Sequence, residues 1–130
     1  MKIDYTDSLD GIEANMLAGF FQGWKKPHAP ETHLEILRQS SHVVLAVDSS
    51  ASRVVGFVTV LSDGRQAAFI PLLEVLSNYQ HRGIGTELMK RVLAKFSSIP
   101  AIDLTCDPHL QGFYARFGMQ PSVGMIMRNY

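Results

Sequence analysis

The sequence predicts a mixed α/β fold built as one domain over residues 1–130. This length suits a single domain with a real hydrophobic core and is too short for two ordinary ones. β-rich runs fill the middle of the chain, and an amphipathic helix candidate separates two strand candidates in its second half. That order indicates a crossover between parallel neighbours, so we expect antiparallel N-terminal strands and one parallel pair.

The first third of the chain is predicted to be helical after a short strand over residues 2–5. Apolar residues recur at helical spacing over residues 9–20, with Asp7 or Ser8 as the N-cap. A proline-containing loop then leads to a second helix around residues 34–37.

Three antiparallel strands are predicted next. Residues 42–47 and 54–61 read as a hairpin, because the small polar residues between them favour a turn. Residues 67–76 are mostly apolar throughout, which suits a strand covered on both faces. Pro71 cannot donate to a ladder, so we expect an irregularity there.

The clearest helix of the chain follows, over residues 86–96, where the apolar side chains form one stripe. A strand over residues 101–106 should follow. Asp107-Pro108 then supplies an N-cap and a first-turn proline for a short helix that ends at Gly118. Residues 119–128 are predicted to finish as extended structure.

Composition excludes several functions. Lysine plus arginine and aspartate plus glutamate both number 12, so no bulk positive field favours nucleic acid. No stretch approaches the roughly 20 apolar residues of a membrane span, and the first residues lack the apolar core of a signal peptide. We therefore expect a soluble, cytoplasmic protein. The single Cys106 forms no internal disulfide, and no Cys and His residues show metal-site spacing.

A glycine-containing loop, residues 80–85, lies between the third antiparallel strand and the amphipathic helix. Free amides at a helix N-terminus, with the positive end of its dipole, form an anion site. Gly83 and Gly85 would let the backbone approach phosphate oxygens, and Arg82 would add charge. No lysine separates Gly85 from Thr86, which disfavours a Walker loop.

A Rossmann loop is also disfavoured, because its third glycine would fall on Leu88.

The run from Leu73 to Gly85 resembles the central motif of the GNAT family of N-acetyltransferases, commonly Gln/Arg-x-x-Gly-x-Gly/Ala. The run from Phe113 to Met119 resembles the Phe-Tyr-x-x-x-Gly-Phe segment of the same family. Departures include Ser77, where proline is common, and Met119 in place of the final aromatic residue.

The resemblance implies acetyl-CoA as donor, CoA as product and a primary amine that attacks directly in a ternary complex. Pantetheine would lie along the strand before the loop, and an amide near Val75 or Leu76 would polarise the thioester carbonyl. The residues that the resemblance assigns to the cofactor are Val75, Leu76, Ser77, Gln80, His81, Arg82, Gly83, Ile84, Gly85 and Thr86.

The resemblance also suggests two catalytic groups. Tyr114 is the candidate acid for the CoA thiolate, and the alternative is a tyrosine packed against the sheet. Glu74 is the candidate base or a member of a water relay, and the alternative is a strand residue that reaches solvent or an arginine. His28, His33 and His109 are further candidate bases, although each is expected to be a surface histidine.

The acceptor is less well defined by the sequence. No acidic cluster indicates a polyamine and no groove motif indicates a peptide, so a small-molecule amine is favoured. Phe20, Phe21 and Trp24 are candidates for the acceptor pocket, but aromatic residues at helical spacing are more often core. The alternatives are a noncatalytic acyl-CoA sensor and a protein-interaction domain of the same fold. The protein is expected to be a monomer or a homodimer.

Overall fold

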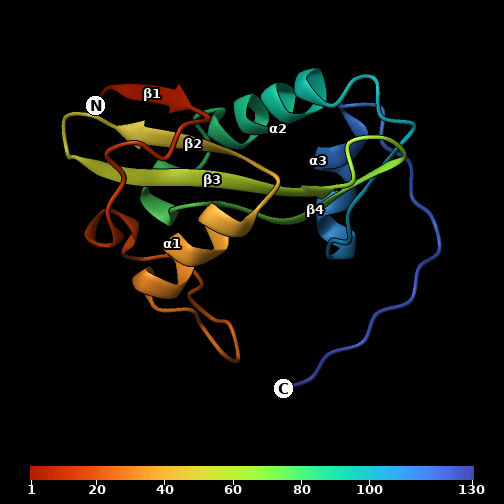
Figure 1. The fold of residues 1–130 in the computed structure, drawn as a ribbon, viewed down its shortest axis with the longest axis horizontal. Helices are drawn as coiled ribbons and strands as arrows, with labels where there is room; N and C mark the ends of the chain where they lie inside the picture. The colour runs from red at the N-terminus through yellow and green to blue at the C-terminus, as the bar shows by residue number, and fades with distance from the viewer.

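The computed structural model describes all residues, 1–130, and contains one five-stranded mixed sheet. The strands lie in sequence order across the sheet (Figure 1). The first three neighbouring pairs are antiparallel and the last pair is parallel. The mixed α/β prediction is therefore confirmed. The strands are β1 (Ile3–Thr6), β2 (His42–Asp48), β3 (Arg53–Ser62), β4 (Ala67–Val75) and β5 (Ala101–Asp103).

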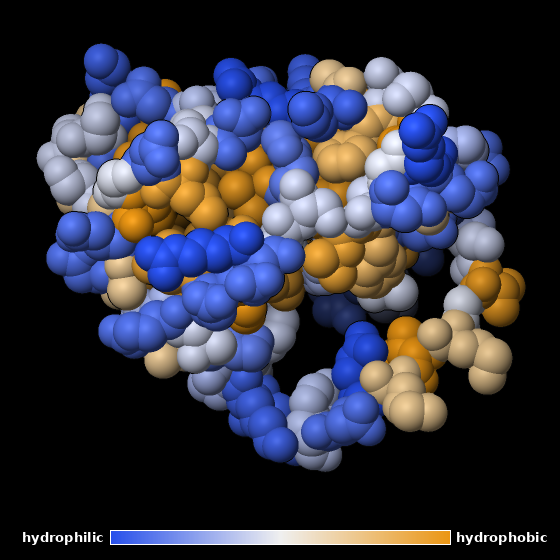
Figure 2. Space-filling view, in the orientation of Figure 1, coloured by the Kyte–Doolittle hydropathy of each residue, from blue (hydrophilic) through white to orange (hydrophobic).

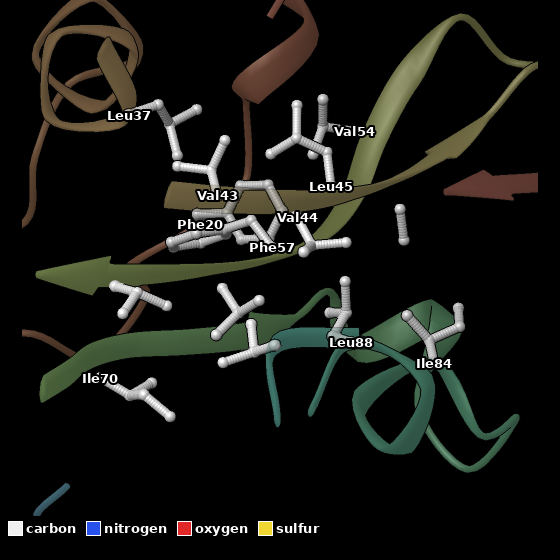
Figure 3. Close-up of a cluster of buried hydrophobic side chains, with 14 of the residues drawn as sticks. Phe20, Leu37, Val43, Val44, Leu45, Val54, Phe57, Ile70, Ile84 and Leu88 are labelled. Carbon is white, nitrogen blue, oxygen red and sulfur yellow. The ribbon is translucent and has the colours of Figure 1, made fainter. Parts of the chain in front are cut away.

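Two helices cover opposite faces of this sheet. Alternate residues of β3 point to opposite sides. Gly56 faces α2 (Ile84–Lys95), and the ring of the next residue, Phe57, packs on His33 of α1 (Pro30–Gln39). The core between the layers is a cluster of 22 buried apolar residues (Figure 3).

The strand covered on both faces is β3, and not β4 as the sequence suggested. Residues 54–60 are all buried, whereas the first half of β4 alternates between buried and exposed. Phe69 is 39% exposed, because no helix covers its face of β4 there. The irregularity predicted at Pro71 is confirmed: the β3–β4 register shifts between Thr59 and Leu61.

The predicted first helix, over residues 9–20, is wrong. Only a 3-10 turn, η1 (Ala14–Leu17), forms in this segment. Gly11 and Gly19 adopt φ values of 77° and 97°, which interrupt any α-helix. The Ser8 hydroxyl oxygen also accepts a hydrogen bond from the backbone N–H of Asp10, at 3.1 Å. The apolar spacing serves instead to bury a folded loop against the sheet.

The extended structure predicted at the C-terminus does not join the sheet as a strand. Residues 119–130 hold no regular secondary structure. Met119 packs against the core, and the residues after it form an arm that stands away from most of the body (Figure 2) and ends with the Tyr130 ring 5.6 Å from the Lys25 ammonium group. Val123 and Met125 are 98% and 99% exposed. The strand predicted over residues 101–106 is limited to the three residues of β5, so its free edge offers few ladder positions to this segment.

Candidate active site

The edge of β4 that faces β5 is open over half its length. The two strands pair only from Ala67 to Phe69, opposite Ala101 to Asp103. Residues 72–75 of β4 keep their ladder with β3 but have no strand on the other side. The splayed parallel pair leaves backbone hydrogen-bonding groups of β4 available to an extended ligand.

A nest of backbone N–H groups lies where β4 leads into α2. None of the six N–H groups from His81 to Thr86 donates to a protein acceptor, and the first helical bond runs from Glu87 N to Gly83 O at 3.0 Å. His81 and Gly83 both adopt left-handed conformations, with φ values of 64° and 82°. Alternating backbone conformations of this kind turn successive amides toward one point, which suits a phosphate.

The nest is held in place from behind by a buried carboxylate. Asp48, at the end of β2, is 3% exposed and accepts the hydroxyl of Tyr79 at 2.7 Å. It also accepts the Ser50 hydroxyl at 2.6 Å and the Ser50 backbone N–H at 3.1 Å. The hydrogen bonds from Ser50 and Tyr79 lower the pKa of Asp48 far below its usual range. Neither Asp48 nor Tyr79 was singled out by the sequence.

Three of the residues assigned to the cofactor have structural roles. The Gln80 side chain turns inward and donates to the Val75 carbonyl at 3.1 Å. Ile84 is 3% exposed and belongs to the core, so only its backbone faces the nest. The hydroxyl of Thr86 accepts a hydrogen bond from Arg116 at 2.9 Å, which ties α2 to the segment after α3 (Gln111–Ala115).

The glycines of the loop serve different purposes. Gly83 needs its left-handed conformation, and a Cβ there would meet no atom within 4 Å. A Cβ on Gly85 would instead lie 3.5 Å from the Phe113 ring and 3.8 Å from Val75. Those distances are ordinary van der Waals contacts, so the packing around Gly85 does not itself require a glycine, whereas the left-handed conformation of Gly83 shapes the nest.

The two candidate amides on β4 are not equivalent. Leu76 N donates to Val55 O of β3 at 2.9 Å, so it is already used inside the sheet. Successive N–H groups of a strand point to opposite edges, which directs the Val75 N–H to the open side. Ser77 N also has no acceptor in the protein. Val75 and Ser77, and not Leu76, present free amides to a ligand.

Glu74 is half-buried on the α1 side of the sheet. The backbone N–H of Phe21 donates to both carboxylate oxygens, at 3.1 and 3.2 Å. Burial raises the pKa of Glu74, and the bond from Phe21 opposes that rise. No arginine or lysine nitrogen lies within 4.0 Å of the carboxylate. A carboxylate without a cation and with a raised pKa is suited to accepting a proton.

Glu74 opens into a cavity of about 330 Å³ at the end of β4. Gly19, Gln22 and Arg53 line it. The other residues that line the cavity continue the chain from β4 into the loop: Glu74, Val75, Leu76, Ser77, Asn78, Tyr79 and Gln80. The structure therefore brings the predicted base and the predicted pantetheine strand together around one space.

Tyr114 lies outside that set of lining residues. It is half-buried on α3, and its ring packs edge-on against Phe113 with centroids 4.9 Å apart. Burial raises the pKa of the Tyr114 phenol, and the charge of Cys106 adds to the rise. Its hydroxyl makes no hydrogen bond within the protein. Through Phe113, which reaches Gly85, Tyr114 is linked to the start of α2.

The histidine and aromatic candidates differ in their burial. His33, expected at the surface, is fully buried, because its ring fills the space between α1 and the rings of Phe20 and Phe57. His109 is exposed on the turn η3 (Pro108–Leu110). Phe20 and Phe21 are core residues, as their spacing suggested, whereas Trp24 is 46% exposed.

Comparison with known proteins gives consistent matches. The model of the acetyltransferase (GNAT) family matches residues 10–119. A proposed acetyltransferase from Deinococcus radiodurans R1 is 41% identical, with a TM-score of 0.93 over 97% of this chain and 87% of that one. A GNAT family acetyltransferase from Streptococcus pneumoniae TIGR4 is 29% identical, with a TM-score of 0.73 over 98% and 97% of the two chains. No curated protein matches the sequence. None of the helices combines the length and apolar character needed to cross a bilayer.

Proposed function

The chain belongs to the acetyltransferase (GNAT) family, and we propose that it transfers the acetyl group of acetyl-CoA to the primary amine of a small molecule. The amine attacks directly in a ternary complex, and residues 1–130 act as one catalytic domain. The observation that carries this proposal is the set of six unpaired N–H groups from His81 to Thr86, next to the open edge of β4.

The residues present fit acetyl-CoA. The amides of residues 81–86 and the positive end of the α2 dipole would hold the pyrophosphate, and the exposed Arg82 adds a positive charge. The free amides of Val75 and Ser77 would bind pantetheine as an added strand. When bound, acetyl-CoA supplies the activated acetyl group as a thioester.

The Val75 N–H is the group that stabilises the reacting carbonyl. It points to the open edge of β4, whereas the Leu76 N–H is bonded to Val55. Negative charge grows on the carbonyl oxygen as the amine attacks, and a fixed amide donor lowers the energy of that charge. The Gln80 side chain bonds to the Val75 carbonyl, which fixes the next peptide group and so the course of the chain directly after this donor.

Proton transfers complete the reaction. Glu74 removes a proton from the ammonium group of the acceptor, directly or through a water molecule, so that the neutral amine can attack the carbonyl carbon. The nitrogen loses its second proton to solvent as the C–N bond forms. The Tyr114 phenol donates its proton to the thiolate as the C–S bond breaks, and the phenolate then regains a proton from solvent. The raised pKa values of both groups keep Glu74 basic enough to accept a proton and Tyr114 protonated.

The alternative is a noncatalytic acyl-CoA sensor with the same fold. The carboxylate of Glu74 favours an enzyme, because a partly buried carboxylate without a cation and with a raised pKa is typical of sites that accept a proton. The cavity of about 330 Å³ lies at the small end of the range for ligand pockets, which favours a small amine over a peptide.

The test is thiol release from acetyl-CoA with a panel of small amines, together with calorimetric titration of acetyl-CoA. We expect acetyl-CoA to bind and at least one amine to give turnover, and Glu74→Gln to lower that turnover without changing acetyl-CoA affinity. Glu35→Gln, at an exposed position of α1, is the matched control. Binding without turnover for any amine would favour the sensor, and absence of binding would exclude both.

A further inference from the structure

Two opposite charges line the cavity at the end of β4 without meeting each other. Arg53 and Glu74 both line it, yet the ion pairs of the protein are confined to Arg38 with Glu35 and Arg91 with Glu87. The guanidinium of Arg53 and the carboxylate of Glu74 are therefore more than 4.0 Å apart. Opposite charges that share one small space would normally pair, so their separation calls for a physical cause.

The cause is a loop that holds each of them. Arg53 Nη2 donates to the carbonyl of Ala18 at 3.0 Å, and Glu74 accepts the N–H of Phe21 through both oxygens. Both anchors belong to the same tight turn, in which Gly19 and Phe21 have positive φ values. The turn keeps the two charges apart and leaves the space between them open to a ligand.

Both groups retain free hydrogen-bonding capacity. A guanidinium has five N–H donors, and Arg53 makes one hydrogen bond within the protein. A carboxylate has about four acceptor sites, of which the Phe21 N–H occupies a part. Polar side chains of Gln22 and Asn78 line the same cavity. This arrangement offers a fork of donors for an anion and an acceptor for an ammonium group.

Building on the proposed function, we propose that the acceptor is a small primary amine that also carries a carboxylate or a phosphate. Its ammonium group lies at Glu74, where the proton is removed, and its anionic group lies at Arg53. A ligand of this kind satisfies both unpaired charges at once, whereas a simple amine leaves Arg53 unpaired. Arg53 is then a specificity residue of the acceptor site.

The experiment compares amines that differ only in the anionic group: glycine and β-alanine against their amides, and phosphoethanolamine against ethanolamine. The kcat/KM for thiol release should be at least about tenfold higher for the anionic member, as expected for a charge-assisted hydrogen bond. The two sets of pairs separate carboxylate from phosphate recognition. Arg53→Gln should bring the ratio close to one and leave the acetyl-CoA dissociation constant unchanged.

The controls separate this proposal from the proposed function. Arg38→Gln, on the exposed face of α1, should keep the native ratio, and melting curves should show that Arg53→Gln is folded. Calorimetric titration of the same amine pairs into the protein saturated with CoA measures the preference without turnover. Equal binding and equal kcat/KM within each pair would overturn the proposal. A loss of acetyl-CoA affinity in Arg53→Gln would also overturn it, because Arg53 would then serve the cofactor.

Discussion

Lowering the pH should destabilise this protein through one buried histidine. His33 is fully buried, and neither of its ring nitrogens has a hydrogen-bond partner. Its ring packs against Phe20, Phe21 and Phe57 with centroids 5.3, 4.8 and 4.3 Å away. Burial, with a smaller contribution from the charge of His28, lowers the pKa of His33 from 6.5 to about 4.

The sign and size of the effect follow from the two pKa values of His33. Below pH 6.5 His33 binds a proton in the unfolded chain, whereas in the folded chain it stays neutral down to about pH 4. The free energy of unfolding therefore falls as the pH drops. At pH 5 this linkage removes roughly 2 kcal/mol of the free energy of unfolding relative to pH 8. The whole difference between the two pKa values corresponds to about 3 kcal/mol, reached below pH 4.

The assay is urea unfolding of the native protein and of His33→Leu at pH 8, 7, 6 and 5. Leucine fills most of the same apolar space without a titrating group, so the free energy of unfolding of the variant should depend less on pH. The difference between the two proteins should change by roughly 2 kcal/mol from pH 8 to pH 5. Other titrating groups, such as His42 and Glu74, contribute equally to both curves and cancel.

His109→Leu is the matched control, because this histidine is exposed and its removal should leave the pH dependence unchanged. The absolute stability of His33→Leu at pH 8 does not matter to the test, since only the change with pH is compared. Parallel pH curves for the native protein and His33→Leu would refute the reasoning.

Three further predictions concern the site. Tyr114→Phe should lower kcat by about a hundredfold to ten-thousandfold with little change in acetyl-CoA affinity, because it removes the proton donor for the thiolate; near-native thiol release across the pH range would exclude this role. Gly83→Glu should abolish acetyl-CoA binding in calorimetry, whereas Gly64→Glu, at another exposed glycine with positive φ, should have the same backbone strain and bind normally. Burial raises the pKa of Glu74, so the folded protein loses stability as the pH rises through the pKa of this group in the folded state. Glu74→Gln should therefore melt at a higher temperature than the native protein at pH 8, while losing turnover. An unchanged melting temperature at both pH 8 and pH 4 would contradict this last prediction.

The parts of the fold predicted from sequence are those that depend on local pattern. The apolar stripe of the helix over residues 84–95 and the glycine at its N-terminus lie within a dozen positions of the sequence. The structure has a helix there, with Gly83 as the N-cap and the apolar stripe buried. The strands over residues 42–48 and 53–62 follow from continuous β-branched runs with a short turn between them. Local signals of this kind need no knowledge of what lies on the other side of the sheet.

The parts that could not be predicted depend on contacts between distant segments. Arg53 reaches Ala18 across 35 positions, and Tyr79 reaches Asp48 across 31. No local sequence pattern predicts contacts between such distant residues, so the sequence analysis did not identify them, although each of them shapes the site. The predicted strand over residues 101–106 is shortened for a similar reason, because its length depends on how far β4 and β5 stay together.

The absence of the first helix is what makes Glu74 usable. In an α-helix the N–H of Phe21 would bond to the carbonyl four residues earlier, and the carboxylate of Glu74 would be half-buried without a donor. The turn frees that N–H, but it places Phe21 in a strained left-handed conformation with a φ of 67°. Phe21 is 1% exposed and is held by the aromatic cluster around His33 and Phe57. The packing of the core thus supports the strained residue that orients the candidate base.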